Sequence, residues 1–92
     1  MVGWVSIRYW SEGKRLSEAT IERLPEYLDG YVYLICADIA LENFNDALWS
    51  YEELLILDPD FEIEKWAKYN DSEYIVDLAK ASFEELVDYS SF

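Results

Sequence analysis

The side chains that could do chemistry in this 92-residue chain are carboxylates, and they gather in one stretch. Between Leu24 and Glu64 the sequence holds eleven acidic residues and no Lys or Arg, while all seven basic residues lie outside it. The eleven are Glu26, Asp29, Asp38, Glu42, Asp46, Glu52, Glu53, Asp58, Asp60, Glu62 and Glu64. Like charges three or four residues apart on a helix repel by roughly 0.2–0.5 kcal/mol per pair. Because the chain accepts this cost repeatedly, we take the eleven carboxylates of this acidic stretch as candidate partner-binding residues.

The residue types do not favour catalysis. The chain has no His, so the commonest general base and metal ligand is missing, and its three glycines form no phosphate-binding loop. Two carboxylates can act as acid and base only in a cleft that separates their pKa values, and so small a domain seldom encloses one. The sequence therefore predicts a protein that is not an enzyme and uses no cofactor.

The alternating carboxylates from Asp58 to Glu64 suggest a calcium loop, but two residues do not fit. An EF-hand loop that began at Asp58 would need Gly at position 63 and a bidentate acid at position 69. The chain has Ile63 and Tyr69 there. We therefore predict a solvated turn in this segment and no metal site.

Composition indicates a single globular acidic domain over residues 1–92. Hydrophobic residues make up 52% of the chain and aromatic residues 17%, which favours a packed core although the formal net charge is −13. The only cysteine, Cys36, lies in an apolar run and is expected to be a buried thiol in a reducing cytoplasm. No segment has the pattern of a membrane span or an export signal. Nucleic acids and anionic membranes share the protein's sign of charge, so the expected partner is a basic protein.

The hydrophobic pattern predicts a mainly helical α+β fold, in which a short N-terminal β-hairpin or strand packs on three to four helices. Val2 to Trp10 alternates β-branched and aromatic residues with small or polar ones, and residues 11–14 have the composition of a turn. A helix is expected over residues 17–29, with a kink or a restart near Leu24 because of Pro25, and with a stop at Asp29-Gly30.

The remaining segments are expected to be helical, with one left open. The apolar run Tyr31–Ala37 fits either a buried strand or a buried helix, and we favour a helix that continues to Glu42. A second helix is expected from Asn45 to Asp58, and a third after Ser72. The third should turn six residues inward: Ile75, Leu78, Ala79, Ser82, Phe83 and Leu86. Residues 61–70 could be a short helix or an extended segment.

Residues 31–59 resemble one tetratricopeptide repeat. The residues at the motif positions are Tyr31, Leu34, Phe44, Ala47, Tyr51 and Pro59. The resemblance implies a helical hairpin, and it offers an alternative function as an adaptor that binds a peptide through Tyr31, Phe44 and Tyr51. No second copy follows, although such solenoids need about three repeats to bury their faces.

Rows of carboxylates on helices could stand in for the phosphates of DNA. Glu18, Glu22 and Glu26 are spaced four apart, as are Asp38 and Glu42, which places successive carboxylates about 6 Å apart along a helix. Phosphates follow one another by about 3.4 Å of axis along each strand of duplex DNA. The sequence therefore favours a DNA-mimic inhibitor that occupies a basic DNA-binding cleft. Two alternatives stay open: acidity that only aids solubility, and an immunity or antitoxin-type protein that plugs a cationic active site.

The whole chain is similar in type to the phage-encoded DNA-mimic anti-restriction proteins, in particular the Arn-type proteins of T-even phages. The similarity lies in length, a very low isoelectric point, the lack of His and acidic residues dispersed among aromatics. It implies an inhibitor of a restriction nuclease or a nucleoid-associated protein that acts in the host cytoplasm to evade host defence. Because the aromatic residues exceed what so small a core readily encloses, a homodimer is also expected.

Overall fold

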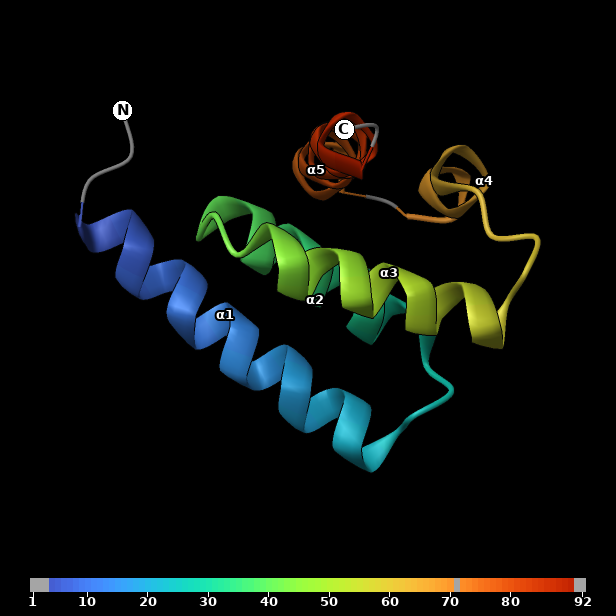
Figure 1. Ribbon diagram of the computed structural model, residues 1–92, viewed down its shortest axis with the longest axis horizontal. Coiled ribbons are helices and arrows are strands. Elements are labelled where there is room, and N and C mark those ends of the chain that lie inside the picture. Colours follow the sequence, from blue (N-terminus) through green and yellow to red (C-terminus); the bar gives the residue numbers. More distant parts are fainter. Residues whose placement is uncertain (1–3, 71, 91–92) are drawn as a thin grey trace.

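The computed structural model of the chain consists of five α-helices (Figure 1). It describes residues 4–70 and 72–90, with side chains from residue 8 onward. The helices are α1 (Trp4–Arg23), α2 (Leu28–Ala40), α3 (Phe44–Leu57), α4 (Ile63–Lys68) and α5 (Glu73–Ser90). Within these residues there is no strand, so the prediction of an α+β fold is wrong and the described chain is all helical.

The N-terminal segment is where the sequence-based prediction fails. The hairpin or strand expected over residues 2–10 is replaced by α1, which begins at Trp4 and continues through the expected turn; residues 2 and 3 lie outside the described part. The inward residues of α1 recur at helical spacing, and they are Trp10, Gly13, Lys14, Ser17, Thr20 and Ile21. Because small and polar residues occupy most of that face, its hydrophobic residues show only a weak helical period. The short segment from Val2 to Trp10 shows the alternation of a strand instead.

Gly13 gives a test of this assignment, since a glycine inside a helix costs about 0.5–1 kcal/mol relative to alanine. A Cβ at Gly13 would lie 3.9 Å from Cε3 of Trp10, an ordinary contact. We expect Gly13→Ala to raise the free energy of unfolding in urea by about 0.5–1 kcal/mol. Gly30→Ala is the matched control, because its Cβ would lie only 3.1 Å from Cγ1 of Ile21, where α1 packs on α2. An equal gain at both positions would contradict this packing.

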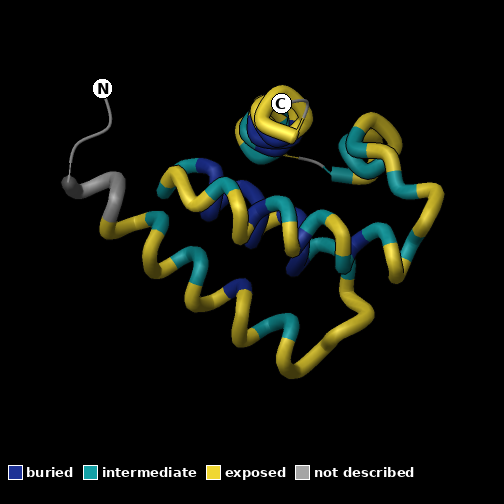
Figure 2. The backbone as a smooth tube through the Cα atoms, viewed as in Figure 1, coloured by how far each residue is buried: buried dark blue, intermediate teal, exposed yellow. Residues whose placement is uncertain are grey.

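Helix α2 is the centre of the fold. It packs against α1, α3 and α5, and every residue from Gly30 to Ile39 except Tyr33 is buried (Figure 2). A helix that is buried on nearly all sides must be apolar all round, which explains why the run Tyr31–Ala37 has no amphipathic period. The preference for a helix there is confirmed. The expected stop at Asp29-Gly30 is wrong, because both residues lie in the first turn of α2, and the break falls after α1 ends at Arg23.

The turn between α2 and α3 holds Glu42 with φ of 63°, in the left-handed region. The Asn43 N–H donates to the Asp38 carbonyl at 2.7 Å, and the Glu42 N–H donates to the Ile39 carbonyl at 3.0 Å. This is the Schellman arrangement, in which glycine is the usual residue at the left-handed position. A side chain there costs roughly 1–2 kcal/mol. The chain therefore keeps a carboxylate at a position where glycine would be more stable.

Helices α3 and α5 follow the predicted patterns closely. In α3, Ala47 and Leu54 are buried in the core, and the helix ends at Leu57, before Pro59. α5 begins after Ser72, whose Oγ accepts a hydrogen bond from the Ile75 N–H at 3.3 Å. Four of its six predicted inward residues are buried and the other two are half-buried. Figure 1 shows α5 end-on, so its axis runs across α2 and α3.

The segment left open, residues 61–70, contains the short helix α4, which packs against α5. Trp66 fixes α4 to the start of α2, because its Nε1–H donates to Oδ1 of Asp29 at 2.7 Å. None of the described helices combines the length and apolar composition that a membrane span needs.

Candidate partner-binding site

The predicted carboxylates are spread over the surface, with one exception. Asp38 is buried, with 1% of its surface exposed, and no other carboxylate in the described part of the chain is buried. Seven of the predicted set are exposed: Glu26, Glu42, Asp46, Glu52, Asp60, Glu62 and Glu64. Asp29, Glu53 and Asp58 are half-buried. The exposed members of the acidic stretch therefore lie on α3, on α4 and in the three turns that connect α1 to α4.

The two carboxylate ladders expected from the sequence do not form. Glu26 lies in the turn after α1 ends at Arg23, so it does not continue the row of Glu18 and Glu22. Asp38 points into the protein, and Glu42 lies beyond the end of α2. The carboxylates are presented from several elements and not from single helical rows.

Some members of the predicted set have structural partners. Asp29 accepts hydrogen bonds from the Trp66 indole at 2.7 Å and from the Tyr27 hydroxyl at 3.2 Å. Glu62 and Glu64 form ion pairs with Lys65 at 2.9 Å and Lys80 at 3.3 Å. Asp58 accepts a hydrogen bond from the Asp60 N–H at 3.2 Å. Seven of the set form no ion pair with any described residue: Glu26, Asp29, Glu42, Glu52, Glu53, Asp58 and Asp60.

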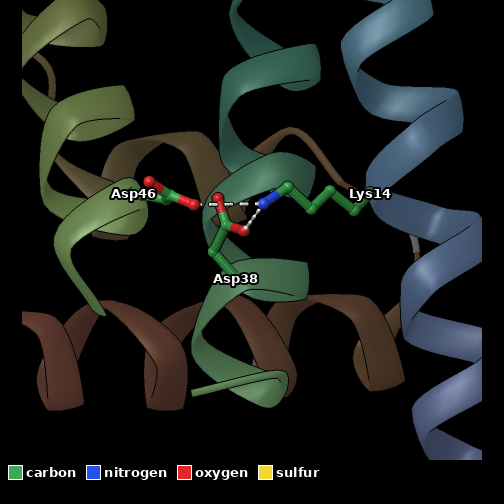
Figure 3. Close-up of polar contacts among 3 residues, drawn as sticks. All are labelled: Lys14, Asp38 and Asp46. Carbon is green, nitrogen blue, oxygen red and sulfur yellow. Dashed lines mark hydrogen bonds and ion pairs between the residues drawn. The ribbon is translucent and has the colours of Figure 1, made fainter. Parts of the chain in front are cut away.

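Lys14 of α1 links three helices through two carboxylates (Figure 3). Its Nζ lies 2.8 Å from Oδ1 of Asp38 in α2 and 3.3 Å from Oδ2 of Asp46 in α3. The contact with Asp38 is an ion pair without good hydrogen-bond alignment, whereas the contact with Asp46 is a hydrogen bond. The sequence placed Asp38 on a binding surface, but the structure gives it an internal partner.

Burial and charge act in opposite directions on this cluster. Burial raises the pKa of Asp38 above its ordinary value, while the Lys14 ammonium opposes the increase. The contact with Asp38 raises the pKa of Lys14, against the lowering effect of burial. Lys14 therefore stays charged at neutral pH, and its charge is what makes an ionised Asp38 tolerable inside the fold.

A groove lies between α1 and α3, and residues of α2 form its floor. Helices α1 and α3 each pack on α2, and their backbones do not approach each other closely in the described structure, although Lys14 and Asp46 make a side-chain contact between them. Two adjoining hollows of about 260 Å³ and 220 Å³ share Glu18, Leu34 and Trp49 in their linings. We call their combined lining the α1–α3 groove: Lys14, Glu18, Ile21, Tyr31, Leu34, Asp38, Asp46, Trp49, Ser50 and Glu53. It combines apolar side chains with carboxylates on both flanking helices.

Sequence reasoning missed Trp49 of this groove, and it did not include Glu18 in the predicted set. Trp49 lies on α3 with 61% of its surface exposed, although tryptophan side chains in folded proteins are highly buried on average. Glu18 lies outside the acidic stretch, so the sequence placed it in a carboxylate row with Glu22 and Glu26 but not among the eleven candidate residues. The available signal was that Trp49 falls outside the inward pattern of a helix whose other periodic positions were well predicted.

A larger hollow, about 550 Å³, lies between α3, α4 and α5. Its apolar lining includes Phe61 and Phe83, and its carboxylates include Glu64, which is already paired with Lys80. This hollow is therefore partly neutralised by the chain itself.

The residues proposed for a peptide-binding adaptor are committed to internal contacts. The Tyr31 hydroxyl donates to the Pro25 carbonyl at 3.1 Å. Phe44 stacks on Tyr89 with ring centroids 5.1 Å apart, and Tyr51 contacts Phe83 edge-on at 5.6 Å. These three side chains do not line a common groove.

No group of acidic or cysteine side chains among the described residues is arranged to hold a metal ion. Comparisons with protein-family models, with curated proteins and with solved structures found no match. The site is interpreted from its own geometry and charge.

Proposed function

We propose that this protein is a DNA-mimic inhibitor whose surface carboxylates occupy the basic DNA-binding cleft of a host restriction nuclease or nucleoid-associated protein. The observation that carries the proposal is that the acidic stretch keeps most of its charge on the surface. Apart from Asp38, every one of its carboxylates is at least partly exposed, and seven of the eleven form no ion pair with a described residue.

Such a surface suits a DNA-binding cleft because that cleft is built from Lys and Arg side chains that face a row of phosphates. The exposed carboxylates would replace the phosphates as partners, and the negative potential of the surface would speed the encounter. The conformation of Glu42 also supports the proposal. A residue held in the left-handed region at a cost in stability is often retained for function, and this one presents a charge.

Salt provides the first test of the proposal. Exposed charges are screened as ionic strength rises, so affinity for a basic partner should fall at least about tenfold between about 0.05 and 0.5 M salt. Titration calorimetry with a purified restriction nuclease and a nucleoid-associated protein would measure it. An affinity that stays constant across this range would contradict charge-based recognition and indicate an apolar interface.

A further inference from the structure

We propose that the α1–α3 groove receives an arginine side chain of the basic partner, with Trp49 against the guanidinium face and Glu18 and Glu53 on its N–H groups. The inference rests on the proposed function, and it identifies the point of the surface at which recognition is most specific.

One end of the groove already holds a cationic side chain. Lys14 reaches across α2 there and contacts Asp38 and Asp46 at 2.8 Å and 3.3 Å (Figure 3). The chain thus shows that carboxylates on two neighbouring helices can hold one extended basic side chain in this groove. The aliphatic part of such a side chain packs along apolar surface while its charged end meets the carboxylates.

The other end of the groove also combines carboxylates with apolar side chains, but no basic side chain of the described chain lines it. Glu18 of α1 and Glu53 of α3 both line it, and neither forms an ion pair with a described residue. Ile21 and Leu34 provide the apolar lining between them. An incoming basic side chain would therefore find two carboxylates on opposite helices and an apolar surface for its stem.

Trp49 selects arginine over lysine. Its side chain lines both hollows of the groove and remains 61% exposed, so an indole is available to a partner. Tryptophan is the best aromatic partner for a cation, and the planar guanidinium can stack on the ring while it donates to carboxylates in its own plane. An ammonium group cannot make both contacts in this way.

The experiment compares two basic peptides that differ only in carrying Arg or Lys at every basic position. Their affinities are measured by titration calorimetry at one fixed salt concentration, so bulk charge is the same for both. We expect the Arg peptide to bind the unmodified protein about five- to tenfold more tightly. Trp49→Ala should abolish this preference, and the double variant Glu18→Gln and Glu53→Gln should reduce it.

Ile56→Ala is the matched control for Trp49→Ala, because Ile56 is another exposed apolar residue of α3, 73% exposed, that does not line the groove. It should keep the full preference. Equal binding of the two peptides to the unmodified protein, or a preference that survives Trp49→Ala, would overturn the groove assignment.

A parallel DNA-displacement assay separates this inference from the proposed function. If the protein displaces DNA from a basic protein but binds both peptides equally, the groove assignment fails and mimicry stands. If it shows the arginine preference, lost in Trp49→Ala, but never displaces DNA, mimicry fails and the groove remains a site for basic proteins.

Discussion

Replacing Lys14 by methionine should lower the free energy of unfolding by about 3–5 kcal/mol, a large share of the stability of a small domain. The substitution keeps most of the side-chain length but leaves the Asp38 carboxylate, 1% exposed, without its cation. Urea denaturation followed by circular dichroism measures the change. A loss below about 1 kcal/mol would show that the pair contributes no more than an exposed salt bridge.

The double variant Lys14→Met and Asp38→Leu is the control, because replacing both members of a buried ion pair by apolar residues is often neutral or stabilising. It should recover most of the lost stability. A double variant as unstable as Lys14→Met would assign the effect to packing of the Lys14 stem and not to the uncompensated charge.

The single variant Lys14→Met should also show a distinctive dependence of stability on pH. Asp38 has a folded-state pKa raised by burial, so its contribution to stability is fully present below its unfolded pKa and is lost as pH rises through the folded pKa. In Lys14→Met, the Lys14 ammonium no longer opposes the effect of burial, which raises the pKa of Asp38. The deficit of Lys14→Met relative to the unmodified protein, compared at equal pH, should therefore shrink as pH falls from about 7 to about 4. A deficit that is constant over this range would contradict the role of the Asp38 charge.

Neutralising Glu42, Glu52 and Asp60 together, to Gln, Gln and Asn, should weaken binding to the proposed basic partner about 3- to 150-fold. All three are exposed and form no described ion pair, and exposed charge contacts contribute about 0.2–1 kcal/mol each. The fold should be unaffected or slightly stabilised, because like-charge repulsion is relieved. Calorimetric affinity and thermal melts measure the two effects separately.

The matched control changes the net charge equally on α5, with Glu73→Gln, Asp77→Asn and Glu84→Gln. These residues lie outside the acidic stretch and are exposed. Neutralising these three residues should weaken binding to the proposed basic partner much less. Equal losses in the two triple variants would show that only net charge counts, and a loss in the α5 variant alone would move the binding face to α5.

Helix positions were predictable where burial is one-sided or complete. α3 and α5 have strong apolar faces, and Pro59 and Ser72 mark where one ends and the other begins. The N-terminal helix was missed because α1 meets α2 through small and polar residues. Gly30 misled for a related reason: it lies at a close contact with Ile21 and does not end a helix.

The candidate site was only partly predictable, because charge patterns along a sequence do not reveal which carboxylates turn inward. Asp38 looked like its neighbours in the acidic stretch, yet it pairs with Lys14, which lies 24 positions earlier in the chain. The groove joins Glu18 to Glu53 and Trp49 only after α1 and α3 both pack on α2. The expected homodimer stays a prediction, and exposed aromatic residues such as Tyr69 and Tyr74 are available for such an interface.

The central claim is that this protein and DNA compete for one surface of a basic protein, and a competition titration tests it most directly. The proposed partner, a restriction nuclease or a nucleoid-associated protein, is titrated with this protein at increasing concentrations of duplex DNA, at fixed salt. Mimicry predicts mutual exclusion, so the apparent Kd should rise in proportion to the DNA concentration and no ternary complex should form. A Kd that does not change with DNA, or a stable complex of all three, would contradict the claim.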